Sequence, residues 1–121
     1  MPMVMHMKPI ELSPEAARLV QICTAIGNPA RFRILEILTS NPESIVADIV
    51  EQLPIAQATV SQHLGVLRDA GLIYGERDGA SQCCRIDFEA VSQFAQAIVG
   101  WTVRLAALGV RGETNGASCR P

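Results

Sequence analysis

Hydrophobic residues recur at helical spacing between residues 53 and 73. Val60, Leu64 and Leu67 follow the spacing i, i+4, i+7, which places them on one face of a helix and predicts that this face packs on a core. Gly71 predicts the end of the helix, because glycine is common just after the last helical residue. This segment therefore predicts a short turn, one amphipathic helix and the start of an extended run.

Three more helices are expected upstream of this segment. A serine before a proline at residues 13–14, and an asparagine before a proline at residues 28–29, are typical of helix starts, and these helices should reach Gly27 and Thr39. Residues 43–53 predict a further helix, which Pro54 separates from the next one. The expected inward residues are Leu19, Cys23, Ile26, Phe32, Ile34 or Leu35, Leu38, Val46, Ile49, Val50 and Leu53.

The pattern changes after residue 73. Two extended runs, residues 73–77 and 82–86, surround a turn signal at residues 78–81 and predict a β-hairpin. Asp87 then caps a last helix, whose hydrophobic stripe is longer than a small core requires, so we expect it to pair with a second copy of the chain. A helix that folds back on its own domain is the alternative. The predicted dimer interface comprises Leu19, Cys23, Ile26, Phe94, Ile98, Trp101, Leu105 and Leu108.

Residues 13–108 are thus expected to form one domain. Residues 1–12, rich in methionine, and residues 109–121, rich in glycine, serine and asparagine, are expected to be a flexible arm and a flexible tail. Of the 121 residues 49% are hydrophobic and 18% charged, which favours a dimer with a buried helical seam over a monomer. We find no apolar run of membrane-spanning length and no secretory signal, so we expect a cytoplasmic protein without a membrane partner.

The helix of the first segment carries unusual outward residues. An exposed helix surface is commonly rich in glutamate and lysine, but this one presents amide, hydroxyl and imidazole groups, which can bond to DNA bases and phosphates. The net charge of −2 argues against gripping nucleic acid by bulk electrostatics, so the basic contacts would be local. We expect base contacts from Gln57, Ser61 and Gln62, and phosphate contacts from Thr59, His63 and Arg68, with a solvated surface histidine as the alternative for His63.

Three motifs occur in an order that resembles a known family. The segment AIGNPARFRILEIL at residues 25–38, the ending TVSQHLGVLRDAGLI at residues 59–73 and the hairpin with Asp78-Gly79 at its tip resemble the winged helix-turn-helix repressors of the ArsR/SmtB family over residues 19–88. The resemblance implies a mainly α, dimeric winged helix-turn-helix fold with a small β-hairpin. It also implies a homodimeric repressor that binds double-stranded DNA, with Arg77 and Gly79 of the wing near the DNA backbone.

The resemblance also raises the question of a metal effector. Two metal sites of the family are lost here, because Ile45 and Ala47 occupy the thiol positions of one, and residues 88–108 lack the histidine of the other. Cys83, Cys84 and Cys119 remain as candidate ligands for trivalent arsenic or another soft metal ion. Successive strand residues point to opposite faces, so Cys83 and Cys84 can share an ion only if the strand is distorted, and Cys119 would be a better partner for one of them. Alternatively, one cysteine packs on the sheet and the other is a surface thiol.

The same residues leave other functions open. Oxidation of Cys23, Cys83 or Cys84 would make the protein a thiol redox or persulfide sensor on the same fold. An effector-independent DNA-binding regulator, or an interaction module that no longer reads DNA, are further alternatives. We do not expect an enzyme, because His6 and His63 are far apart in the sequence and His63 has no evident nucleophile or carboxylate partner.

Overall fold

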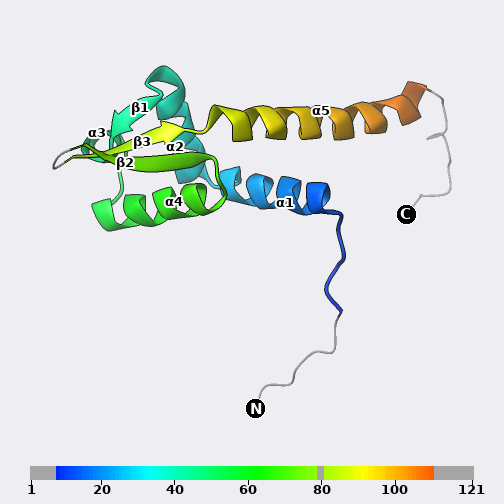
Figure 1. The fold of residues 1–121 in the computed structure, drawn as a ribbon, viewed down its shortest axis with the longest axis horizontal. Helices are drawn as coiled ribbons and strands as arrows, with labels where there is room; N and C mark the ends of the chain where they lie inside the picture. The colour runs from blue at the N-terminus through cyan, green and yellow to red at the C-terminus, as the bar shows by residue number, and fades with distance from the viewer. Residues whose placement is uncertain (1–7, 79–80, 111–121) are drawn as a thin grey trace, which may run out of the picture.

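The computed structural model describes residues 8–78 and 81–110, and Figure 1 shows their arrangement. Within these residues, five helices and three strands form a mainly helical body with one small antiparallel sheet. In chain order the elements are α1 (Pro14–Ile26), α2 (Pro29–Ser40), β1 (Glu43–Ile45), α3 (Val46–Glu51), α4 (Gln57–Asp69), β2 (Ile73–Asp78), β3 (Ser81–Ile86) and α5 (Phe88–Val110). Helices α3 and α4 form the predicted helix-turn-helix, and β2 and β3 form the wing.

Capping side chains start three of the helices where the sequence predicts. The Ser13 hydroxyl and the side-chain oxygens of Asn28 and Asp87 accept backbone N–H groups from the first turns of α1, α2 and α5, at 2.9 to 3.1 Å. Ala56 precedes α4 and supplies no side-chain cap, because alanine has no side-chain acceptor. At the other end of α4, Gly71 has φ +78°, which confirms the predicted helix stop.

The helix expected over residues 43–53 is shorter than predicted. Residues Glu43–Ile45 form β1, which pairs antiparallel with β3 and turns the expected hairpin into a three-stranded sheet of order β1-β3-β2. Two contacts hold these residues extended: Glu43 forms an ion pair with Arg85 of β3, and the buried Ser44 hydroxyl donates to the Asn41 carbonyl at 3.0 Å. The helix therefore begins only at Val46, once the strand has ended.

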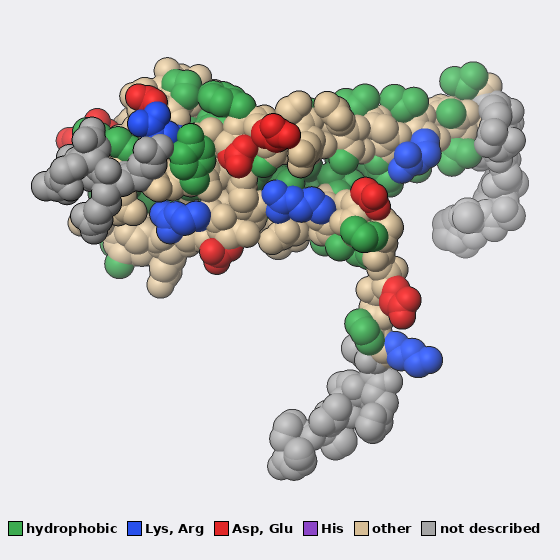
Figure 2. Space-filling view, in the orientation of Figure 1, with side chains coloured by type: hydrophobic (Ala, Val, Ile, Leu, Met, Phe, Trp, Pro, Cys, Tyr) green, Lys and Arg blue, Asp and Glu red, His purple; other side chains and the backbone are tan. Residues whose placement is uncertain are grey.

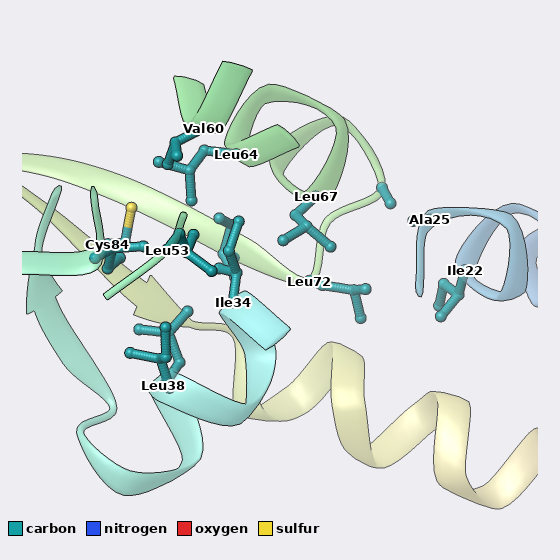
Figure 3. Close-up of a cluster of buried hydrophobic side chains, with 14 residues drawn as sticks. Ile22, Ala25, Ile34, Leu38, Leu53, Val60, Leu64, Leu67, Leu72 and Cys84 are labelled. Carbon is teal, nitrogen blue, oxygen red and sulfur yellow. The ribbon is translucent and has the colours of Figure 1, made fainter. Parts of the chain in front are cut away.

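One hydrophobic core lies between the helices and the sheet (Figure 3). The predicted stripe of α4 is confirmed, since Val60, Leu64 and Leu67 are all buried. The sheet contributes Cys84 from β3, which is 0% exposed and belongs to the same cluster. The cluster consists of Ile22, Ala25, Ile34, Ile37, Leu38, Ile49, Leu53, Val60, Leu64, Leu67, Ala70, Leu72, Ile73 and Cys84.

Two expected core residues lie elsewhere. Phe32 is 50% exposed, because the core face of α2 is formed by Ile34 with Ile37 and Leu38, and a residue two positions before Ile34 points away from it. Cys23 is also exposed, because α1 faces the core with Ile22 and Ala25 instead. Leu19 and Ile26, predicted on the same stripe as Cys23, are only partly buried.

Helix α5 contributes little to this core. It runs alongside α1 and extends past the body (Figure 1), and Ala90 is its buried residue. Its exposed hydrophobic residues include Trp101 and Leu105. In the part of the chain that the structure describes, no helix is long and apolar enough to cross a membrane.

We predict that Cys84 resists alkylation in the folded protein, whereas Cys23 and Cys83 react. Burial raises the pKa of the Cys84 thiol above its ordinary value of 9.0; the nearby charge of Arg68 opposes this, and Cys83 adds to it. Alkylation requires the thiolate, so Cys84 should be labelled only after the protein is unfolded. Mass spectrometry after brief iodoacetamide treatment at neutral pH measures this order, and equal labelling of Cys83 and Cys84 would contradict it.

The same shift has a pH-dependent effect on stability. Because the pKa of Cys84 is higher in the folded state, folding favours the neutral thiol, and this contribution is present below pH 9.0 and lost as the pH rises above it. The difference in free energy of unfolding between wild type and Cys84→Ala should therefore be largest at neutral pH and should shrink at alkaline pH. Urea unfolding of both proteins measures it, with Cys83→Ala as the control.

Candidate nucleic-acid interface

The outward face of α4 is polar and carries little charge. Gln57, Ser61 and Gln62 are exposed on it, as the sequence predicts, while Thr59 and His63 are partly buried. This separation follows from the core residues of α4, which fill the opposite face of the same helix. The arrangement leaves amide and hydroxyl groups free to form directional hydrogen bonds with a partner.

The start of α4 has unsatisfied donors. The N–H groups of the first turn of a helix have no partner within the helix, and no side chain caps them here because Ala56 occupies the capping position. Such N–H groups, together with the positive end of the helix dipole, favour an anion such as a phosphate. The exposed polar side chains and these donors lie on one helix.

Arg31 is bound within the protein. Its Nε donates to the Ala25 carbonyl at 2.5 Å and its Nη2 to the Thr24 carbonyl at 3.3 Å, so it satisfies the last carbonyls of α1. Its Nη1 lies 3.3 Å from Nδ1 of His63 on α4. Arg31, which belongs to α2, therefore connects α1 to α4.

A second arginine contacts the carboxyl end of α4. Arg18 of α1 donates from Nη1 to the Ala70 carbonyl at 2.6 Å and to Gln21 Oε1 at 2.9 Å. Gln21 in turn donates to the Asp69 carbonyl at 3.4 Å. A positive charge at the carboxyl end of a helix also interacts favourably with its dipole. Sequence reasoning missed this contact, because Arg18 and Ala70 are 52 residues apart and no local pattern links them.

The wing lies beside α4. Arg68, exposed near the end of α4, has its Nε 3.8 Å from the position that a Cβ would take at Gly75 of β2. Arg85, a basic residue of the hairpin strand β3, forms an ion pair with Glu43 and so is partly neutralised. The backbone of Arg77 lies in β2 opposite Gln82, but its side chain and all of Gly79 lie outside the described residues.

The two adjacent cysteines of β3 do not converge. Cys84 points into the core and Cys83 is partly buried on the other face, as alternation along a strand requires. This geometry does not fit an ion held by both sulfurs, and it matches the alternative in which one cysteine packs on the sheet. Cys119 lies outside the described residues, and within them no group of three or more histidine, cysteine or acidic residues could hold a metal ion.

The predicted dimer residues lie along two grooves. Leu19, Cys23, Ile98 and Trp101 line an apolar groove of about 660 Å³ between α1 and α5. Figure 2 shows hydrophobic side chains along α5. Ile26 and Phe94 line a second groove of about 380 Å³ next to α2, where the exposed Phe32 also lies. Leu105 and Leu108 are exposed further along α5. The structure thus places these residues in two apolar grooves and on the exposed part of α5, and their pairing with a second copy stays a prediction.

Comparisons with known proteins point to one family. A family model described as "Bacterial regulatory protein, arsR family" matches residues 28–74, which include α2, α3 and α4. Over 62 residues the chain is 34% identical to an uncharacterised HTH-type transcriptional regulator of Methanocaldococcus jannaschii, covering 51% of this chain and 70% of that protein. It is 38% identical over 69 residues to the HTH-type transcriptional regulator NmtR of Mycobacterium tuberculosis, covering 57% of each.

A solved structure shares both the fold and part of the sequence. The crystal structure of a "possible transcriptional regulator for arsenical resistance" superposes with a TM-score of 0.59 and 30% identity, covering 69% of this chain and 91% of that one. The residues that the family model matches contain the helix-turn-helix whose outward face is described above. These relatives are transcriptional regulators.

We predict opposite effects of alanine at two glycines near α4. Gly71→Ala should lower the free energy of unfolding by about 1–2 kcal/mol, because φ +78° is strained for alanine and its Cβ would lie 2.9 Å from Arg18 Nη2. Gly65→Ala, inside α4 with open space around the added Cβ, should raise it by about 0.5–1 kcal/mol. Urea unfolding measures the change in free energy of unfolding for both variants. Equal changes would contradict the left-handed backbone conformation of Gly71 at the end of α4.

Proposed function

Because this chain belongs to the arsR family of bacterial regulatory proteins, we propose that it is a homodimeric transcriptional repressor that binds a specific operator in double-stranded DNA. The observation that carries the proposal is the outward face of α4, where exposed amide and hydroxyl groups lie on a helix that two arginines hold in place. Gel-shift assays with DNA from its own upstream region test it, and equal affinity for random DNA would argue against it.

In this proposal α4 lies in the major groove. Gln57, Ser61 and Gln62 contact base edges, since glutamine can bond to adenine in two places and serine to several bases. Thr59, His63 and Arg68 contact phosphates, and the uncapped N–H groups at the start of α4 donate to another phosphate. In the wing, Arg77 and Gly79 lie along the DNA backbone.

The proposed dimer presents two copies of α4. A twofold-symmetric pair places its reading helices in successive major grooves about 34–36 Å apart, which matches a palindromic operator. The length of α5 supports the dimer. Its Trp101 and Leu105 are 46% and 49% exposed, on a hydrophobic stripe that the core of the same subunit does not cover. A hydrophobic surface of this length is unusual on a protein that stays alone in water.

We further propose that a thiophilic effector releases the protein from DNA. Cys83 is the more accessible thiol of the wing, so trivalent arsenic would bind there with Cys119 rather than with the buried Cys84. The similar protein described as a possible regulator for arsenical resistance supports this choice of effector. The effector can shift DNA binding only by its differential affinity for the two conformations, commonly about 1–3 kcal/mol.

The exposed Cys23 supports a redox-sensing alternative. Gel shifts in the presence of arsenite, zinc or peroxide distinguish release by a metal or metalloid from release by oxidation. Release by arsenite that persists in both Cys83→Ala and Cys119→Ala would exclude the proposed metalloid site. Release by peroxide alone, lost in Cys23→Ala, would favour the redox sensor.

We predict that Gln62→Ala weakens operator binding by about 1–3 kcal/mol and relaxes the preference at one base pair, because an amide that reads a base is lost. Gln93→Ala removes an exposed glutamine of α5 and should leave the affinity unchanged. Fluorescence anisotropy on operator and random duplexes measures both variants. A loss that is equal on the two duplexes would reassign Gln62 to the DNA backbone.

We also predict that one charge on the hydrophobic stripe of α5 separates the dimer. Leu105→Glu places a carboxylate in the proposed seam and should give monomers at micromolar concentration. Val103→Glu is the matched control, because Val103 is also exposed but lies on the opposite side of α5 by helical spacing. Sedimentation equilibrium measures both masses, and a wild-type monomer, or dimers in both variants, would contradict the proposed seam.

A further inference from the structure

The contact between Arg31 and His63 defines where the histidine proton must be. A guanidinium group has only N–H donors and keeps its charge, so an imidazole nitrogen that faces it has to be the acceptor. Nη1 of Arg31 lies 3.3 Å from Nδ1 of His63, so Nδ1 carries the lone pair. The proton of the neutral ring is then on Nε2.

The second nitrogen of the ring is available to a partner. Among the described residues, Nε2 of His63 has no hydrogen-bond partner, and it is not among the buried side-chain atoms that lack one. Nε2–H therefore reaches solvent on the side of the ring away from Arg31. His63 follows Gln62 on α4 and is less exposed than Gln62, so its donor is set back from the outermost side chains of the helix.

Arg31 is itself held by other contacts. Its Nε and Nη2 donate to the carbonyls of Ala25 and Thr24 at the end of α1, and Asn28 accepts the backbone N–H of Arg31 at 3.1 Å. The guanidinium is thus oriented by α1 and α2 before any ligand arrives. A ring held by such a group loses little rotational freedom when it binds.

We infer that Arg31 is a positioning residue that fixes His63 as an Nε2–H donor, and that this donor binds a phosphate oxygen of the DNA backbone. A phosphate oxygen is the acceptor that fits this donor best. The ring offers a single N–H, whereas base recognition commonly uses two hydrogen bonds at once. The N–H is also set back from the outermost side chains of the helix, which suits a charged oxygen at the edge of the groove. This inference rests on the proposed function and assigns Arg31 a role through His63 rather than a direct contact with DNA.

Two substitutions of His63 separate its two nitrogens. Asparagine can place an amide oxygen near the position of Nδ1 and keep the Arg31 contact, but it lacks the outer donor. Glutamine can place an amide N–H near the position of Nε2. We expect His63→Gln to keep operator affinity within about threefold and His63→Asn to lose at least about tenfold, as expected for one hydrogen bond to a charged group. The loss should be similar on operator and random DNA, because phosphates carry no sequence information. Equal affinities of the two variants, or a loss confined to operator DNA, would overturn the phosphate contact.

The role of Arg31 is tested without DNA. Long-range ¹H–¹⁵N spectra of the free protein at pH 8 distinguish the two neutral tautomers, and His6→Ala identifies the signals of His63. We expect the Nε2–H tautomer in wild type and a mixture of tautomers in Arg31→Met. A Nδ1–H tautomer in wild type, or the same tautomer in Arg31→Met, would overturn the positioning role. Because these spectra need no operator, a protein that shows the expected tautomers but binds no DNA would refute the proposed function and leave the role of Arg31 intact. A urea unfolding curve of Arg31→Met checks that the variant is folded under the conditions of the NMR spectra.

Discussion

Two arginines join helix α4 to helix α1 in this protein. The last carbonyls of a helix have no partner within it, and they need donors from elsewhere. Arg31 supplies donors to the end of α1 and also contacts His63 on α4, while Arg18 of α1 supplies a donor to Ala70 at the end of α4. Both contacts join α1 to α4, and they add to the packing of Val60, Leu64 and Leu67 on the core, which turns the polar face of α4 outward.

Helix α1 contacts both proposed surfaces, the polar face of α4 that would bind DNA and the groove with α5 that would form the dimer. Helix α1 carries Leu19 and Cys23 in the groove shared with α5, and it carries Arg18 against α4. In the proposed dimer, a change in how α1 and α5 pair would also move the helices that read DNA. Cys83, on the sheet, lies outside this connection, so an effector bound there would act through the wing. The arrangement therefore offers two physical routes for release, one through the helices and one through the sheet.

Local signals in the sequence predicted much of the fold. Caps at Ser13, Asn28 and Asp87 and the stop at Gly71 depend on neighbouring residues only, and all four were correct. The strand β1 was missed because it depends on pairing with β3, about forty residues away. The contacts of Arg18 and Arg31 were missed for the same reason, since both partners come together only in the folded chain. Strand alternation did predict that adjacent cysteines point apart, but not which one would be buried.

The central claim is that a symmetrical pair of subunits presents two α4 helices to one DNA duplex. Hydroxyl-radical footprinting on operator DNA, combined with the protein-to-DNA stoichiometry from analytical ultracentrifugation, tests it most directly. The account predicts two chains per duplex and two protected regions whose centres lie about one helical turn, 10–10.5 base pairs, apart. One chain with a single protected region, or protection that does not depend on sequence, would contradict it.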